Sequence, residues 1–178
     1  ADEEALAAAR AGFTALVPAW AHISLLRFGP LQAENRFERV FFWPDPRGVI
    51  VRQAQALLAG GDESALTPEG LSGKSVALQG LPALEFVLHG SGAEELAGSA
   101  GSYRCRYGAA VAANLAGIAR ELAAEWVPGA PFQAAFTAPS AGGDAYRSKQ
   151  EVAGEVVKPI GAGLQFVRNA ELLPALGE

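Results

Sequence analysis

Apolar residues recur along this chain at helical spacing, and glycine and proline separate the apolar stretches. Residues 3–28 carry apolar side chains three or four positions apart and end at Gly29-Pro30. The same periodicity predicts further helices over 49–58, 75–88, 102–126 and 148–169. No stretch alternates in the manner of consecutive strands. The sequence therefore predicts an all-α protein.

Four to five main helices with moderate loops favour an up-and-down helical bundle, here a single domain over residues 1–178. Prolines lie within the first and last helices, at Pro18 and Pro159, so we expect kinks there. Thr67 followed by Pro68 predicts a short helical turn. Ser148 and Glu151 match a capping box that opens the last helix.

The segment Val76–Leu88 is the most apolar of these helices, with Gln79 and Glu85 as its polar residues. A helix that is apolar nearly all round is expected to be buried, which would bury Glu85 as well. A buried carboxylate must be paired, bind a metal or take up a proton. Pro82 leaves the Leu78 carbonyl without its helical partner, so a kink is expected.

Composition narrows the class of protein. Half of the 178 residues are hydrophobic and 19% are charged, as in a packed globular chain. The net charge of −5, without a basic cluster, argues against nucleic-acid binding. Methionine is absent, at position 1 as well, which leads us to expect a processed or trimmed chain. The single cysteine, Cys105, allows no internal disulfide, and we interpret it as a small buried residue.

Candidate metal and catalytic residues are few. The two histidines, His22 and His89, are far apart, so the chain lacks the paired histidines of a zinc peptidase. Glu85 and His89 are four residues apart on one helix and could contribute to a metal site. The alternative is that His89 faces water at the end of the helix.

A buried Glu85 would favour an arginine partner with bidentate geometry. Trp43 and Asp45 could border a cleft around Glu85, although an aromatic side chain that anchors the loop is the simpler interpretation. An ion pair with a purely structural role is the alternative for Glu85. The predicted ligand-binding set is Glu85, Arg27, Arg36, Trp43, Asp45 and Arg104.

Residues 80–90 resemble the imelysin-like family, also classified as the M75 peptidase family. Gly80 and Glu85 match its Gly-x-His-x-x-Glu motif, and Leu88-His89-Gly90 is similar to its closing Leu-Trp-Gly. Arg27-Phe28-Gly29-Pro30 and Trp43-Pro44 are also similar, and the order of helices agrees across the chain. Pro82 stands at the position of the motif histidine, which disfavours a His/Glu metal site and enzymatic activity.

The resemblance implies a fold of two similar four-helix bundles with a functional site between them. This chain has about half the family's length, so it is expected to be one bundle. Its partner would be the second bundle, from the same gene or a separate chain. The resemblance also implies a bacterial protein of iron uptake, free in the periplasm or held at the outer surface by a lipid anchor.

Three functions follow from these observations. The first is a non-catalytic, imelysin-like protein of iron homeostasis whose cleft around Glu85 binds a ligand, iron or another divalent metal. The second is a metallopeptidase with Glu85 as general base, for which the sequence supplies no good set of zinc ligands. The third is a structural helical module in which Glu85 only closes an internal ion pair.

Overall fold

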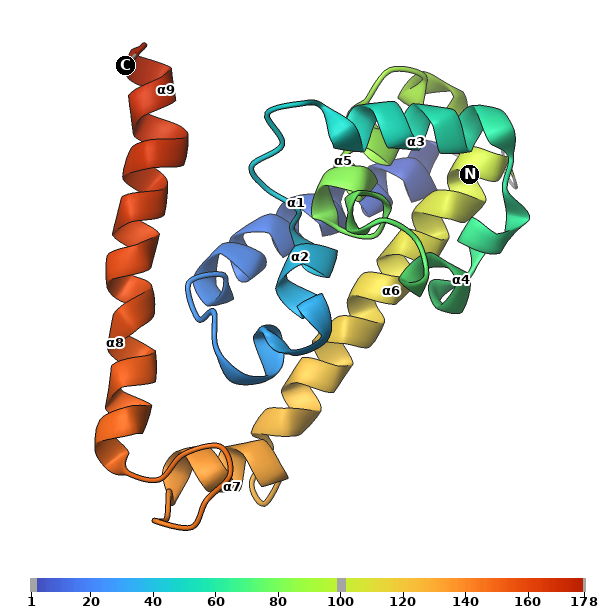
Figure 1. Ribbon diagram of the computed structural model, residues 1–178. Coiled ribbons are helices and arrows are strands. Elements are labelled where there is room, and N and C mark those ends of the chain that lie inside the picture. The colour runs from blue at the N-terminus through green and yellow to red at the C-terminus, as the bar shows by residue number, and fades with distance from the viewer. Residues whose placement is uncertain (1–2, 99–101, 178) are drawn as a thin grey trace. The chain divides into compact units, whose positions relative to one another are not determined.

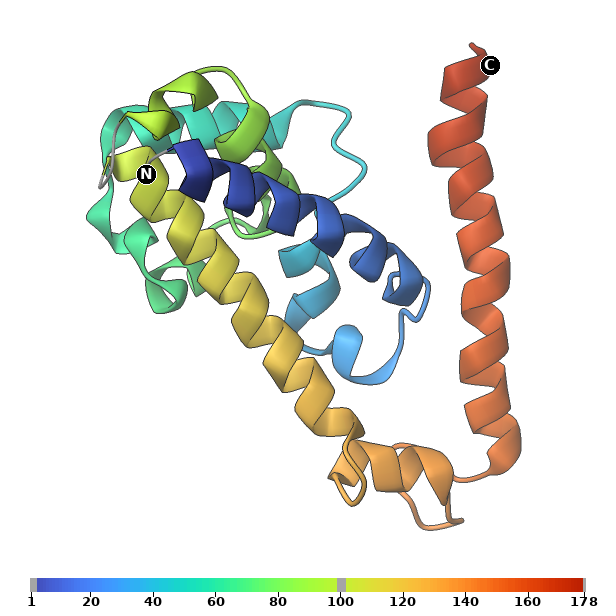
Figure 2. The same ribbon diagram turned by 180° about the vertical axis from the view of Figure 1, so that it is seen from behind.

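The computed structural model describes residues 3–98 and 102–177, and every regular element in these ranges is helical (Figures 1 and 2). This confirms the all-α, helical-bundle fold class. The α-helices are α1 (Glu3–Ile23), α2 (Arg36–Val40), α3 (Val49–Gly60), α4 (Pro68–Ser72), α5 (Leu81–His89), α6 (Tyr103–Trp126), α7 (Pro131–Thr137), α8 (Lys149–Phe166) and α9 (Leu173–Leu176). No helix in the described ranges is both long and apolar enough to cross a membrane.

The chain divides into two compact units. The first unit comprises Ala1–Trp20 and Arg36–Ala119, and the second comprises Ala21–Asn35 and Arg120–Glu178. The interpretation of residues 1–178 as one domain, and as half of a two-bundle protein, stays a prediction.

Local sequence signals account for several helix ends. The Thr67 hydroxyl accepts a hydrogen bond from the Gly70 amide, as expected of an N-cap. Ser148 caps α8 by accepting from the Glu151 amide at 3.2 Å, and the Glu151 carboxylate accepts from the Arg147 amide at 2.7 Å. The predicted capping box is therefore present, with its returning bond one residue earlier than in the usual form.

The first helix is shorter than predicted. It ends at Ile23 rather than at position 28, because residues 26–28 form tight turns whose amides donate to carbonyls two or three residues back. The helices α1 and α8 each continue through their internal prolines, Pro18 and Pro159.

The predicted kinked helix over 75–88 is wrong. The structure has a short helical turn over Val76–Leu78, and α5 then begins at Leu81 with Gly80 as its N-cap. Pro82 lies in the first turn of α5, where no intrahelical partner for its missing N–H is needed, so it starts the helix instead of bending it.

Gly80 is required at this break by close backbone packing. A Cβ atom at this position would lie 2.3 Å from the carbonyl oxygen of Val40 and 2.8 Å from that of Arg39. The end of α2 therefore packs directly on the start of α5, and only a residue without a side chain allows this approach.

A buried polar network stabilises the backbone between the turn Val76–Leu78 and the start of α5. Gln79 is 1% exposed and Asn114 of α6 is 4% exposed. The Gln79 amide nitrogen donates to the Lys74 carbonyl at 2.7 Å, and its Oε1 accepts from Arg39 Nε at 3.1 Å. Asn114 Nδ2 donates to the Gln79 carbonyl at 3.1 Å, and Asn114 Oδ1 accepts from Arg39 Nη2 at 3.4 Å. Arg39 of α2 thus joins the side chains of Gln79 and Asn114.

Tyr107 of α6 satisfies the neighbouring carbonyl. Its hydroxyl donates to the Leu78 carbonyl oxygen at 2.8 Å, and the side chain is fully buried. Burial raises the pKa of Tyr107, so the phenol stays protonated and keeps its donor at all ordinary pH values.

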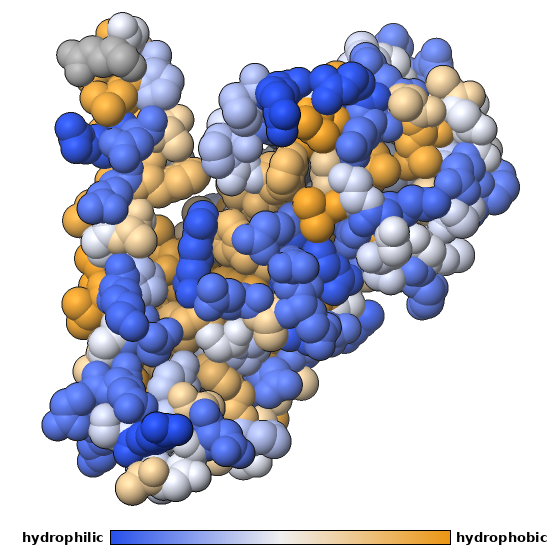
Figure 3. Space-filling model, viewed as in Figure 1, coloured by the Kyte–Doolittle hydropathy of each residue, from blue (hydrophilic) through white to orange (hydrophobic). Residues whose placement is uncertain are grey.

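The second unit has an aromatic core. Phe28 stacks on Phe136 with ring centroids 5.7 Å apart, and Trp126 meets the edges of Phe132 and Phe136 at 4.9 and 5.2 Å. Gly29 has φ +54°, and a Cβ there would meet the Phe132 ring at 2.3 Å. Apolar side chains remain exposed along α8, with Val157, Ile160 and Leu164 more than half exposed (Figure 3).

The close contact at Gly80 yields a stability prediction. We expect Gly80→Ala to lower the free energy of unfolding by about 1–3 kcal/mol, because the backbone at the end of α2 must shift. Gly117→Ala, in the middle of α6 with open space around it, should instead raise it by about 0.5–1 kcal/mol. Urea unfolding of both variants checks this, and a Gly80→Ala protein as stable as the parent would contradict it.

Candidate functional site

Glu85 is exposed, which corrects the expectation that it is buried. The exposed or half-exposed positions of α5 are Pro82, Glu85 and His89, whereas the other six residues are buried. These three positions are spaced three and four residues apart, so they form one narrow stripe that faces away from the core. The Glu85 carboxylate has no hydrogen bond or ion pair with any described residue, so the arginine partner expected for it is absent from that part of the chain.

Arg104 binds the C-terminal end of α5 rather than Glu85. Its guanidinium donates to the carbonyl oxygens of Val87 at 3.0 Å, Ser91 at 2.8 Å and Phe86 at 2.7 Å, and it lies 5.2 Å from the Phe86 ring centroid. Desolvation lowers the pKa of Arg104, and the nearby Glu95 and Glu94 oppose this shift. A cation at the end of a helix pairs well with its unsatisfied carbonyls, so Arg104 has a structural role.

Asp45 is likewise explained by local structure. Its two carboxylate oxygens accept hydrogen bonds from the amides of Val49 and Ile50, both at 2.8 Å, at the first turn of α3. Desolvation raises the pKa of Asp45, but the backbone hydrogen bonds from Ile50 and Val49 outweigh it and leave the pKa below the ordinary value. Asp45 therefore stabilises the start of a helix.

No hydrogen bond or ion pair among the described residues joins Glu85 to the remaining predicted residues, Trp43, Arg36 and Arg27. Trp43 is 44% exposed and lies 6.4 Å from the Phe41 ring. Arg36 begins α2 in the first unit, and Arg27, in the second unit, lies over the Phe166 ring at 5.5 Å. Their assignment to a ligand site stays a prediction.

The donor groups of the described residues do not form a metal site. Within 3–98 and 102–177, no three residues of the types His, Cys, Asp and Glu gather closely enough to hold an ion. His89 is exposed at the end of α5, and its ring lies 5.8 Å from that of Phe13. Glu85 and His89 therefore lack a third ligand in this part of the chain.

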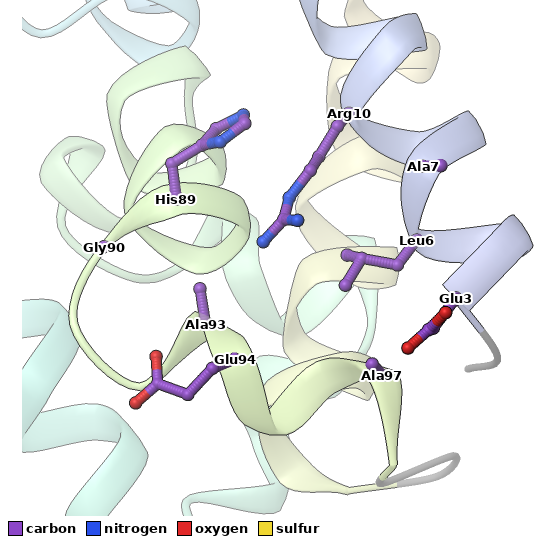
Figure 4. Close-up of a pocket in the computed structure, with 9 residues that line it drawn as sticks. All are labelled: Glu3, Leu6, Ala7, Arg10, His89, Gly90, Ala93, Glu94 and Ala97. Atoms are coloured by element: carbon purple, nitrogen blue, oxygen red, sulfur yellow. The ribbon is translucent and has the colours of Figure 1, made fainter.

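A pocket of about 700 Å³ opens beside the end of α5 (Figure 4). It lies among α1, the last residues of α5 and the short helical turn Ala93–Ala97. We call it the polar pocket, because it carries four ionisable side chains. Its lining residues are Glu3, Leu6, Ala7, Arg10, His89, Gly90, Ala93, Glu94 and Ala97.

Arg10 is the best-positioned polar group in this pocket. Its Nε donates to the Leu88 carbonyl oxygen at 3.0 Å, which fixes the plane of the guanidinium. The two terminal nitrogens make no hydrogen bond or ion pair with any described residue. Figure 4 shows the guanidinium extending from α1 into the space in front of α5 and Ala93. This arrangement leaves a flat pair of donors ready for a carboxylate.

The negative charges of Glu3 and Glu94 in the polar pocket are partly offset by groups other than Arg10. Glu94 is close enough to Arg104 to oppose the lowering of its pKa, and Figure 4 shows the Glu94 carboxylate directed away from Arg10. Glu3 is in the first turn of α1, where the helix N-terminus favours a negative charge.

Sequence reasoning missed Arg10, although a signal was present. Arg10 follows Leu6 by four residues and precedes Phe13 by three, so it occupies the apolar stripe of the first helix. A charged residue on that stripe must find a partner at the protein interior or line a cavity.

These features define an all-α protein with a polar pocket at the end of a buried helix. A family model described as imelysin (Peptidase_M75) matches residues 1–177, so the chain belongs to the imelysin family, as its Gly80–Gly90 motif suggested. No curated protein and no solved structure gives a significant match.

The role of Arg104 can be tested by a pair of substitutions. We expect Arg104→Gln to lower the free energy of unfolding by about 1.5–3 kcal/mol, because charged hydrogen bonds to several carbonyls are lost. Arg106→Gln breaks only an exposed pair with Glu63 and should cost less than about 1 kcal/mol. Thermal and urea unfolding measure both, and equal losses in the two variants would contradict the structural role of Arg104.

Proposed function

We propose that this chain is a non-catalytic imelysin-family protein that binds a small ligand in the polar pocket and takes part in bacterial iron uptake. The observation that supports binding most directly is Arg10, whose guanidinium is oriented by Leu88 while its terminal nitrogens remain unpaired among the described residues. Membership of the imelysin family supports the setting, in the periplasm or at the outer surface by a lipid anchor, with a second helical bundle as partner.

The chemistry of the donor set favours a non-catalytic role over a metallopeptidase. A catalytic zinc needs three protein ligands and an open position for water. No such group gathers in the described residues, and Pro82 occupies the place of the motif histidine. Glu85, the general base that a peptidase would need, faces solvent on the outer stripe of α5.

The shortage of metal ligands among the described residues also bears on the chemical form in which iron would bind. Because the described residues gather no set of three protein ligands, we expect the iron to bind as a complex with an organic chelator rather than as a bare ion. A chelator with a carboxylate group matches the paired donors of Arg10, since guanidinium and carboxylate form two parallel hydrogen bonds. His89 offers a further polar contact near that group. The carboxylates of Glu3 and Glu94 accept hydrogen bonds only, so they suit hydroxyl groups of the chelator rather than its carboxylates.

Calorimetric titration with ferric citrate, iron-free citrate and ferric chloride tests this function. We expect the citrate-containing ligands to bind the parent and to bind Arg10→Gln at least about 10-fold more weakly, because a charged hydrogen-bonded pair is lost.

The matched control is Glu85→Gln, which should leave binding unchanged. Loss of binding in Glu85→Gln but not in Arg10→Gln would return the site to the originally predicted cleft. Stoichiometric binding of iron from ferric chloride, or stoichiometric zinc in the purified protein together with peptide cleavage, would overturn the proposal.

A further inference from the structure

A second pocket lies beside the polar pocket and differs from it in chemistry. It has a volume of about 360 Å³ and is bounded by α1, α5 and α6. We call it the apolar pocket, because every residue that lines it is apolar or, in the case of Cys105, only weakly polar. Such a pocket offers water no hydrogen bonds, so water in it is readily displaced by hydrocarbon.

Small residues on two helices create this space. Ala9 and Gly12 of α1 and Ala109 and Ala112 of α6 line the pocket without filling it. Its inner side is formed by the buried Leu84, Val87 and Leu88 of α5.

Gly108 sets the spacing of α6 from α5. A Cβ on Gly108 would lie 2.8 Å from Val87 Cγ1, so the two helices pack closely at this point. The space lined by the small residues of α1 and α6 has a volume of about 360 Å³, which is enough for an alkyl chain.

The two pockets share a lining residue close to Arg10. Leu6 lines both of them, and Arg10 follows one turn later on α1. Leu88 lines the apolar pocket, and its carbonyl oxygen accepts the hydrogen bond from Arg10 Nε. A guanidinium whose terminal nitrogens have no partner among the described residues thus lies one helical turn from a residue, Leu6, that lines both pockets.

We infer that the ligand is an amphipathic carboxylate, with its acid group on Arg10 and an alkyl chain in the apolar pocket. The inference rests on the proposed function, because it specifies the ligand class of the same site. Charge complementarity at Arg10 favours this occupant over an uncharged apolar molecule or a helix from another protein chain.

Binding of straight-chain carboxylates from butanoate to dodecanoate, measured by calorimetry below their micelle concentrations, tests the inference on the full chain. We expect each added CH₂ group to tighten binding up to about fourfold until the pocket is full. Dodecanol, which lacks the acid, should bind at least about 10-fold more weakly than dodecanoate, and Arg10→Gln should remove that difference.

Two alanines of α6 provide a matched pair of variants. Ala109→Leu places a side chain in the apolar pocket from an exposed position, and Ala113→Leu adds the same group at an exposed position outside it. We expect Ala109→Leu to weaken dodecanoate at least about 10-fold while ferric citrate binding is unchanged, and Ala113→Leu to affect neither.

Cys105 supplies an independent readout of where the chain binds. It is the only cysteine, it lines the apolar pocket and it is partly exposed, which corrects its expected burial. Dodecanoate should slow the reaction of this thiol with a maleimide, whereas butanoate should not.

The outcomes separate the two proposals. Arg10-dependent binding of ferric citrate without any dependence on alkyl length would overturn the amphipathic ligand and leave the proposed function standing. Dodecanoate binding that depends on Arg10, with no binding of ferric citrate, would support the ligand class and overturn the iron chelate. Failure of both probes would overturn both. If dodecanoate does not bind and Ala109→Leu alters the oligomeric state in size-exclusion chromatography, the pocket is a contact between protein chains.

Discussion

The first unit depends on supplying hydrogen-bond partners for both ends of a short buried helix. At the start of α5, Tyr107 and Asn114 of α6 bind the Leu78 and Gln79 carbonyls, and Arg39 of α2 binds the side chains of Gln79 and Asn114. At its end, Arg104 donates to several carbonyls. Backbone groups without partners would be costly in this interior, so α6 both packs on α5 and satisfies its ends.

This constraint gives the motif over Gly80–Gly90 a structural meaning. Gly80 admits the carbonyls of α2, and Pro82 begins the helix. Glu85 and His89 then fall on the stripe of α5 that faces away from the core. In this chain the residues of the family motif therefore start α5 and carry its polar side chains on the solvent-facing side of the helix. They do not enclose a buried metal site.

The functional proposals depend on the contact between α1 and the C-terminal end of α5. Arg10 enters the apolar stripe of α1 and is held by the Leu88 carbonyl, one residue before the end of α5. Arg10 lines a space with ionisable side chains, and its neighbours on the same stripe, Leu6 and Phe13, line a space of hydrocarbon. This single guanidinium can anchor the acid group of a molecule with two unlike ends.

The sequence by itself determined the helical class, the caps at Thr67 and Ser148, the long α6 and the family, because these depend on spacing and on local hydrogen bonds within a few residues. It did not determine the burial of Glu85, since nine helical residues leave one stripe free and only neighbours in space decide which one. It also gave no access to Arg10 as a site residue or to the partners of Arg104. Those depend on carbonyls 78 and 17 positions away in sequence, which only the packing of α1 and α6 on α5 brings into contact.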